Sequence, residues 1–387
     1  MENLKDLFKK NIRQYGMLIA LISIMIFFQI VSKGTLLRPL NITNLILQNS
    51  YILVLAIGML LVIVAFQIDL SVGSTAAFIG AVSGILMVKM KLPVIPSILI
   101  CLAIGAVIGA WQGFWVAYVK IPAFIVTLAG MLIFRGLTMV TLNGTSMAPF
   151  PKEFQKISSG FVPDIFNGKE IHITTIIIGI IFTVVYILFE IYNRNNQKKY
   201  NFEVISQKFF IAKIVLISAA INAFTITLAK YKGIPNVLIL LFILILIYSF
   251  VASKTILGRH IYALGGNEKA ARLSGVKTKR NVFLVFVNMG MLAALSGLVF
   301  TARLNAATPK AGTNFELDAI AACYIGGASA SGGVGTIIGA IIGGLVMGVM
   351  NNGMSLMGIG IDWQQAIKGL VLLIAVAFDI FTKSKNS

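Results

Sequence analysis

Long apolar runs, each bounded by charged residues or proline, follow one another along the whole chain of 387 residues. A helix needs about 20 apolar residues to cross the hydrocarbon core of a bilayer. The chain is 58% apolar and only 12% charged, and a water-soluble domain normally carries about twice that share of charge. The runs lie near residues 16–31, 43–66, 71–88, 93–119, 121–142, 172–192, 209–229, 234–252, 281–302, 316–350 and 363–382. We therefore predict an all-α polytopic membrane protein that forms a single transmembrane domain over residues 1–387.

The run at 316–350 is too long for one crossing. A single helix over these residues would extend about 50 Å, against a hydrocarbon layer of about 30 Å. The glycine pairs Gly326-Gly327 and Gly332-Gly333 are the expected break points. We expect two half-length or re-entrant pieces there, which lipid tolerates only where protein or a water-filled cavity satisfies the freed backbone groups. This gives about ten transmembrane helices plus a broken glycine-rich pair, with twelve as the other even count.

The formal charge of +19 does not indicate a nucleic-acid binder, because the basic residues lie between the apolar runs and form no single patch. Lys5, Lys9, Lys10 and Arg13 precede the first run, which we interpret as an uncleaved helix with a cytoplasmic N-terminus. Alternation of sides then places both termini and two basic segments, 193–208 and 253–280, in the cytoplasm, and it makes 143–171 an external loop. The excess of basic residues on the cytoplasmic side is imperfect, because this scheme places four basic residues on the external side: Lys33, Arg38, Lys89 and Lys91. Basic cytoplasmic segments of this kind are attracted to anionic membrane lipid.

Residues 67–74 read Gln-Ile-Asp-Leu-Ser-Val-Gly-Ser and place Asp69 between two apolar runs. A carboxylate facing lipid there would cost several kcal/mol, on the order of 3. We therefore expect Asp69 or Ser71 to form a turn or N-cap for the following helix, with Gly73 in its first turn. The alternative is a proton or cation relay, which a lone acid supports poorly.

The segment from Gly258 to Arg280 contains a short capped helix at the cytoplasmic surface. Asn267 or Gly266 is the expected N-cap, Glu268 lies at the favourable end of the helix dipole, and Gly275 stops the helix after about two turns. A rigid surface helix is suited to contact with another protein. The alternative is an ordinary solvated loop.

Three strings carry a resemblance to a known family: residues 68–74, residues 262–276, and the glycine-rich stretch 326–339. In this order they resemble the permease subunits of bacterial monosaccharide ABC importers, with the ribose, xylose and galactose permeases as the nearest class. The resemblance implies a multi-pass protein of the bacterial cytoplasmic membrane. It also implies that the loop around Gly265–Gly275 docks on a cytoplasmic ATP-binding subunit through Gly265, Gly266, Asn267, Glu268, Ala271 and Gly275. An external sugar-binding protein and a second permease subunit, expected to be an identical copy, complete the implied assembly.

The chain departs from the shortest ribose-type permeases in its middle. Residues from about 143 to 230 are longer and include an extra hairpin formed by the runs at 172–192 and 209–229. This length is more similar to xylose or multiple-monosaccharide permeases.

No catalytic, metal or cofactor signature is found in the sequence. It contains no phosphate-binding loop of the form Gly-x-x-x-x-Gly-Lys-Ser/Thr and no His-Glu-x-x-His or Gly-x-Ser-x-Gly string. Its two cysteines, Cys101 and Cys323, lie in apolar surroundings, so neither a disulfide framework nor a thiolate metal site is indicated. We expect no cofactor, no metal and no enzymatic activity, with ATP hydrolysis on a separate subunit.

A sugar path needs amide or carboxylate groups for hydroxyls and aromatic faces for C–H surfaces. The candidates within the runs are Gln112, Trp111, Asn288 and Asn351, and each could instead be an ordinary helix contact. Arg135 lies within an apolar run and needs a partner, for which Glu316 and Asp318 are candidates. Further polar or aromatic candidates are Gln48, Asn49, Asn352, Trp115 and Phe124.

Glycines at every fourth residue predict close helix packing, as at Gly105, Gly109 and Gly113 and at Gly335, Gly339 and Gly343. The sequence leaves open whether these faces meet within one chain or between two chains. It also leaves open two other functions. One is an ion-coupled secondary transporter, which also uses broken helices, and the other is an ABC permease for a branched-chain amino acid or a nucleoside.

Overall fold

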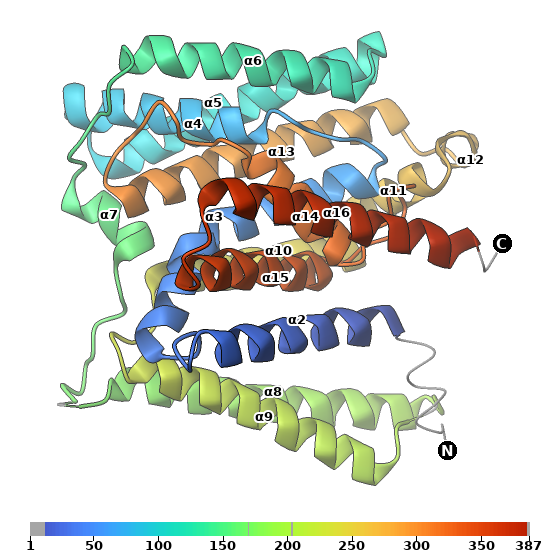
Figure 1. Cartoon of the computed structure of the whole chain (residues 1–387). Helices are drawn as coiled ribbons and strands as arrows, with labels where there is room; N and C mark the ends of the chain where they lie inside the picture. The colour runs from blue at the N-terminus through green and yellow to red at the C-terminus, as the bar shows by residue number, and fades with distance from the viewer. Residues whose placement is uncertain (1–11, 169, 203, 385–387) are drawn as a thin grey trace.

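The computed structural model describes residues 12–168, 170–202 and 204–384, and Figure 1 shows them as a bundle of long helices lying side by side. The basic residues Lys5, Lys9, Lys10 and Lys385 lie outside the described residues. Within the described part of the chain there is no β-strand, only two isolated bridges, Met147 with Ala307 and Phe161 with Pro235. The predicted all-α fold is confirmed.

The helices are α2 (Ile12–Val31), α3 (Pro39–Val64), α4 (Val72–Gly84) with the π-helix η1 (Ile85–Lys89), α5 (Val94–Phe114) with the π-helix η2 (Trp115–Val119), α6 (Ala123–Leu142), α7 (Lys152–Ser159), α8 (Ile173–Lys199), α9 (Gln207–Ala229), α10 (Asn236–Lys254), α11 (Ile256–Gly266), α12 (Glu268–Leu273), α13 (Thr278–Leu304), α14 (Phe315–Ile325), α15 (Ile337–Leu356) and α16 (Ile361–Ser384).

Proline and asparagine mark many of the helix boundaries. Pro39 is at the first position of α3, and Pro93 and Pro122 immediately precede α5 and α6. Proline suits these places because the first N–H groups of a helix have no partner within it. Asn143 and Asn305 follow α6 and α13 with positive φ values of 48° and 55°, a conformation that asparagine tolerates better than most residues.

Nine helices of the described chain are long and apolar enough to cross a membrane, and the segment Gly16–Val31 is a shorter apolar helix. The run at 316–350 breaks between Ile325 and Ile337, as predicted. Of the two expected half-length or re-entrant pieces, only the first is half-length. The first piece, α14, has 11 residues, whereas α15 has 20, which is enough for a full crossing. α15 continues six residues beyond the end of the apolar run at residue 350.

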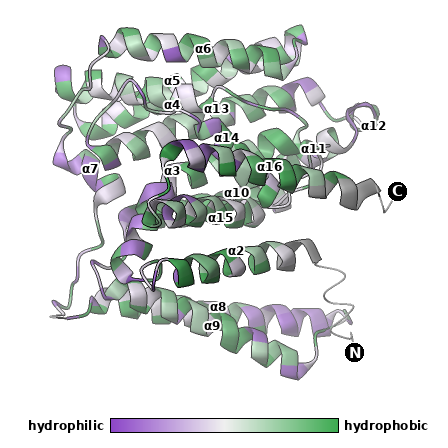
Figure 2. Cartoon of the chain, viewed as in Figure 1, coloured by the Kyte–Doolittle hydropathy of each residue, from purple (hydrophilic) through white to green (hydrophobic). Residues whose placement is uncertain are grey.

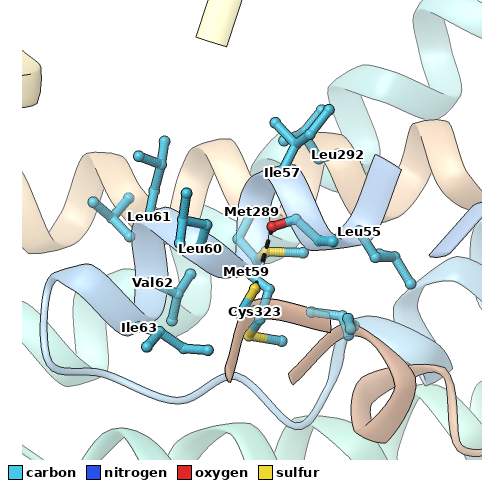
Figure 3. Packing of buried hydrophobic residues seen from close by; sticks show 14 of the residues in the cluster. Leu55, Ile57, Met59, Leu60, Leu61, Val62, Ile63, Met289, Leu292 and Cys323 are labelled. Atoms are coloured by element: carbon cyan, nitrogen blue, oxygen red, sulfur yellow. Dashed lines mark hydrogen bonds between the residues drawn. The ribbon is translucent and has the colours of Figure 1, made fainter. Parts of the chain in front are cut away.

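The core of the bundle lies around α3. In its most apolar window 83% of the residues are buried, and Figure 3 shows Leu55, Leu60 and their neighbours packed against Met289 and Leu292 of α13. Cys323 of α14 lies against the same helix, with its Sγ 3.4 Å from the carbonyl oxygen of Ala56. Residues 52–64 of α3 are all apolar, and a helix segment that is apolar all round is expected at the centre of a membrane protein.

The glycine spacings pack helices of the same chain. A Cβ atom on Gly109 of α5 would overlap the backbone of Phe286 in α13, and one on Gly290 of α13 would overlap the backbone of α5. In the same way, a side chain on Gly343 of α15 would overlap Ala322 of α14. Small residues thus let these backbones touch, as the four-residue spacing indicated.

Helices α8 and α9 form a hairpin at the edge of the bundle (Figure 1), where α9 contacts α3. Only 17% of the apolar window of α8 and 6% of that of α9 are buried. The two helices are joined to each other by a hydrogen bond from Asn222 to Thr183 (3.0 Å). This is the extra hairpin of the sequence analysis, and most of its surface faces away from the protein.

Hydrophilic residues gather at two opposite ends of the bundle, which Figure 2 shows in purple. One end, here called the α7 end, carries α7 and the rest of segment 143–171. The other, the α12 end, carries α12 and the connection between α8 and α9. The first described residues of α2 and the last of α16 both lie at the α12 end (Figure 1).

Candidate substrate cavity and coupling helices

A polar cavity of about 330 Å³ lies between α3, α13, α14, α15 and α16. Amide and charged side chains dominate its wall, in a region otherwise built from apolar helices. Its lining residues are Gln48, Asn49, Tyr51, Phe300, Arg303, Thr313, Asn314, Asp318, Asn351, Ile361, Gln364, Gln365 and Lys368.

An ion pair crosses one wall of this cavity. Lys368 Nζ of α16 lies 2.9 Å from Asp318 Oδ1 of α14, and the two side chains are 21% and 8% exposed. Charged groups at membrane depth are expensive unless they are paired or wetted. The pair therefore fixes α16 to α14 at the cavity.

The aromatic rings of Tyr51 and Phe300 also line the cavity, and Phe315 packs behind Tyr51. The Tyr51 ring lies 4.1 Å from that of Phe315 and 5.1 Å from that of Phe300, measured between centroids. Rings beside amide groups are the combination that binds the C–H surfaces and hydroxyls of a sugar.

Two neighbouring asparagines of α15 have different surroundings. Asn352 exchanges two hydrogen bonds with Asn41 of α3, at 2.8 and 3.1 Å. Asn351 lines the cavity, and its buried Oδ1 has no hydrogen-bond partner in the described part of the chain. A buried acceptor without a partner is costly, so a ligand hydroxyl that donated to Asn351 would relieve that cost.

Of the four substrate-path residues predicted from sequence, the structure brings only Asn351 to the cavity. Gln112 donates to Ser71 Oγ at 2.7 Å, and Asn288 accepts from the hydroxyl of Tyr248. Trp111 is 38% exposed and packs edge-on against Phe134. These three residues hold helices together, which was the alternative interpretation of each.

Several cavity residues were missed. Gln364 and Lys368 lie four residues apart at the start of the last apolar run, and this spacing puts them on one face of α16. A polar stripe of this kind at the beginning of a span was the available signal. Gln48 and Asn49 were noted among the polar residues of the runs, and both line the cavity.

Asp69 forms a tight turn between α3 and α4. Its Oδ1 accepts from the backbone N–H of Ser71 at 2.8 Å and from Ser71 Oγ at 2.7 Å. Ser71 is the N-cap residue of α4, but no side-chain capping bond is made there. The expected turn is present, whereas the expected N-cap hydrogen bond to the first turn of the helix is absent. Gly73 follows in α4, where a Cβ atom would overlap Gly312 and Glu316.

Arg135 donates to a backbone carbonyl and forms no ion pair with either expected carboxylate in the described part of the chain, although its charge acts on one of them, Glu316. Its Nη1 donates to the carbonyl oxygen of Ala311 at 2.6 Å. Asp318, one of the two candidate partners, pairs with Lys368. Arg135 thus fastens α6 to the connection between α13 and α14.

Segment 253–280 consists of two short helices in sequence, α11 and α12. Asn267 is the N-cap of α12, and its Oδ1 accepts from the N–H of Ala270 at 3.0 Å. After α12, Gly275 adopts a positive φ of 84°, and the N–H of Val276 donates to Ala271 at 3.0 Å, which is a Schellman stop. Gly265 and Gly266 precede this N-cap and form the last turn of α11.

Gly265 of α11 is in backbone contact with two other segments. A Cβ atom there would overlap the carbonyl oxygen of Val64 and come within 2.7 Å of the Gly333 nitrogen. The N–H of Gly333 itself donates to Val64 at 2.9 Å. One turn earlier in α11, the hydroxyl of Tyr262 donates to the carbonyl oxygen of Gly335 at 2.7 Å.

The loop at 326–336, here called the glycine loop, follows α14 in the chain and contacts α11. It therefore links α11 to α14 in space. Gly327, Gly332 and Gly333 have φ values of 79°, 73° and 70°, which favour glycine over residues with a side chain. From this loop α14 runs back to Asp318 at the cavity, about 12 Å along the helix axis. The two segments that the sequence analysis treated separately are thus in direct contact.

α12 presents an apolar side chain to solvent. Leu273 is 88% exposed, and the basic residues Lys269 and Arg272 beside it are also exposed. Glu268 lies 3.6 Å from Lys120, with both side chains about half exposed. An exposed pair of this kind contributes little to stability, so Glu268 remains accessible to a partner.

Two parts of the sequence, residues 41–169 and 160–376, match the family described as branched-chain amino acid transport system / permease component. The chain belongs to this family. With nine helices in its described part that are long and apolar enough to cross a membrane, it is a multi-pass transport permease of the bacterial inner membrane.

Among curated proteins, the chain is similar to the xylose transport system permease protein XylH of Haemophilus influenzae, with 40% identity over 97% of this chain and 98% of that one. XylH of Escherichia coli is 38% identical, over 97% of this chain and 94% of that one. The ribose import permease protein RbsC of Escherichia coli is 34% identical, over 93% and 92%. No solved structure gives a significant match.

Proposed function

We propose that the chain is the transmembrane permease subunit of an ATP-driven importer for a monosaccharide of the xylose or ribose type. The substrate class is carried by one observation: relatives named as xylose and ribose permeases match more than nine-tenths of the chain. The polar cavity with its amide groups and aromatic wall is consistent with this cargo.

The α12 end is proposed to face the cytoplasm. Segments 193–208 and 253–280 bring most of their basic residues to this end, as the positive-inside rule favours. The cavity then opens in the outer half of the membrane, because Gln48 and Asn49 belong to the half of α3 that is nearer the α7 end. A sugar released by an external binding protein would reach Asn351 and the Tyr51 ring first.

The partner at the α12 end is proposed to be a separate ATP-binding subunit. Leu273 with Lys269 and Arg272 offers an apolar contact flanked by positive charge. Movement of α12 would be passed to α11, and from Gly265 and Tyr262 to the glycine loop. The glycine loop continues into α14, so the Asp318–Lys368 pair at the cavity would respond to closure of the ATPase.

The permease itself is proposed to supply only differential affinity between outward-facing and inward-facing states. A second copy of the chain is proposed to complete the path. An external sugar-binding protein is proposed to deliver the cargo. The residues that bind the sugar are proposed to be Asn351, Asn49, Gln48 and Gln364, with the aromatic wall.

Uptake by reconstituted vesicles tests this function. Vesicles with the chain, an ATP-binding subunit and a sugar-binding protein are expected to accumulate labelled xylose or ribose when ATP is supplied, even after a proton or sodium uncoupler is added. Uptake by the chain alone that collapses with the ion gradient would instead establish a secondary transporter. Preferential uptake of leucine or a nucleoside would establish one of the other ABC cargoes.

A further inference from the structure

A second cavity, of about 390 Å³, lies within the α8–α9 hairpin at the α12 end. Its walls come from both helices and from the turn between them. Glu190 and Arg194 of α8, Tyr200 and Phe202 of the turn, and Phe210 and Lys213 of α9 are among its lining residues. We call it the hairpin cavity. It is separate from the polar cavity and from the coupling helices.

The guanidinium of Arg194 places a positive charge in this cavity. Much of the hydrogen-bonding capacity of this group is unused. The guanidinium lies 4.2 Å from the centroid of the Phe210 ring, and its Nη2 donates to the carbonyl oxygen of Ile205 at 3.3 Å. Its Nε is buried and has no hydrogen-bond partner in the described part of the chain. Because a guanidinium offers five N–H donors in a planar fork, an anionic oxygen is the expected complement.

The one acidic side chain among the named lining residues is already neutralised. Glu190 Oε1 lies 2.8 Å from Lys213 Nζ. Between residues 190 and 213 the sequence carries five basic residues, Arg194, Lys198, Lys199, Lys208 and Lys213, and two acidic ones, Glu190 and Glu203, which leaves a net charge of +3. This stretch of the sequence thus carries an excess of positive charge, which favours an anion.

The position of the hairpin indicates where that anion comes from. Helices α8 and α9 bury little of their apolar surface against the rest of the protein, so lipid surrounds them in a membrane. Near the cavity, Tyr192, Tyr200 and Phe202 are 64%, 65% and 66% exposed. Exposed aromatic residues at the end of a span are typical of the headgroup level of a bilayer.

We propose that the hairpin cavity binds the phosphate group of an anionic phospholipid. Arg194 donates to the phosphate oxygens, the amides of Asn193 and Gln197 line the remaining space, and Tyr200 and Phe202 cover the glycerol and upper acyl region. Free phosphate shares the same charge and oxygens, but it would leave these aromatic side chains without a partner. The lipid ties the peripheral hairpin to the membrane surface.

Lipid retention by the purified full-length chain tests this proposal. The chain is extracted from vesicles with equal amounts of phosphatidylglycerol and phosphatidylcholine, and bound lipid is measured by native mass spectrometry. Wild-type chain is expected to retain phosphatidylglycerol in preference to phosphatidylcholine. Arg194→Gln is expected to weaken this retention about tenfold, the loss of one charge-assisted interaction.

The matched control is Lys230→Gln, which removes one positive charge at an exposed position at the other end of α9 and is expected to retain lipid as the wild type does. Equal retention of the two lipids by the wild type would overturn the proposal, as would equal losses in both variants. The comparison of the two lipids in the wild-type chain needs no variant, so it tests the proposal even if Arg194→Gln folds poorly. Displacement of the lipid by inorganic phosphate would assign the cavity to free phosphate and would also overturn the proposal.

Discussion

The backbone N–H of Gly333 donates to the carbonyl oxygen of Val64 at 2.9 Å, and Gly265 packs against both residues. Val64 is the last residue of the buried helix α3, Gly333 belongs to the glycine loop, and Gly265 lies in the last turn of α11. Three segments that are far apart in sequence therefore meet through their backbones. A contact without intervening side chains transmits displacement with little slack, because packed backbone atoms have no rotamers to absorb it.

The first prediction compares alanine substitutions at two adjacent glycines of α11, Gly265 and Gly266. Gly265→Ala is expected to destabilise the fold by about 1–3 kcal/mol, because the new methyl group overlaps Val64 and crowds Gly333. ATP-driven uptake is expected to fall severalfold. Thermal unfolding and vesicle uptake measure the two effects.

Gly266→Ala is the matched control, because a Cβ atom on Gly266 meets nothing within 4 Å. Its stability is expected to stay within about 0.5 kcal/mol of the wild type. If both alanine variants transport as the wild type does, the route through Gly265 is wrong.

The second prediction concerns the ion pair of the polar cavity. Lys368→Gln is expected to destabilise the protein by about 1–3 kcal/mol, because it leaves the carboxylate of Asp318 without its cation at a poorly solvated place. The double variant with Asp318→Asn is expected to recover part of this loss. A double-mutant cycle of unfolding free energies measures the coupling, and a coupling energy of zero would show that the pair does not hold α14 to α16.

The third prediction separates the neighbouring asparagines of α15. Asn351→Ala is expected to reduce sugar uptake while leaving thermal stability nearly unchanged, because Asn351 Oδ1 has no partner to lose. Asn352→Ala is expected to lower stability by about 1 kcal/mol through loss of its bonds to Asn41. Normal uptake by Asn351→Ala at low sugar concentration would remove this residue from the path.

The fourth prediction concerns the acid sensitivity of segment 143–171, which is proposed to be external. Desolvation alone would raise the pKa of Asp164, but hydrogen bonds from Thr174 Oγ1 and from the backbone N–H groups of Thr174, Gly168 and Ile173 hold that pKa well below its ordinary value. A carboxyl whose pKa is depressed on folding stabilises the protein above its unfolded pKa, about 4, and this contribution is lost as the pH falls further.

Hydrogen exchange at the N-terminus of α8 measures this effect. In the wild type, protection of the Ile173 and Thr174 amides is expected to decrease when the pH is lowered beyond about 4. The Asp164→Asn variant is expected to show weaker protection that depends less on pH. Equal protection of the two proteins at neutral pH would contradict the role of the carboxylate.

The sequence predicted the fold class and most helix positions, because apolar runs in lipid have one solution for their backbone hydrogen bonds. It also located the break at 326–336 and the cap at Asn267, which depend on local glycine and asparagine chemistry. The contact of Gly265 with Val64 and Gly333 could not be predicted, because it joins residues about 70 to 270 positions apart in the numbering.

The polar cavity illustrates the same limit. Gln112, Asn288 and Asn351 are all amides in apolar runs, and periodicity gives no means of choosing among them. Gln112 and Asn288 form hydrogen bonds with Ser71 and Tyr248 across helix boundaries, although Asn288 Nδ2 is buried without a partner in the described part of the chain. These bonds depend on how the helices are arranged. Lys368 escaped notice because its partner, Asp318, lies on another helix.

The central claim is that an ATP-binding subunit on the cytoplasmic side grips α12, and labelling of Leu273→Cys with a membrane-impermeant maleimide tests it most directly. The native thiols Cys101 and Cys323 are buried, so background labelling is expected to be low. The account predicts labelling only in inside-out vesicles and protection when the ATP-binding subunit is bound. Asn195→Cys, exposed on α8 at the same end, is expected to be labelled from the same side without protection. Labelling of Leu273→Cys from the outside, or labelling that the subunit leaves unchanged, would contradict the account.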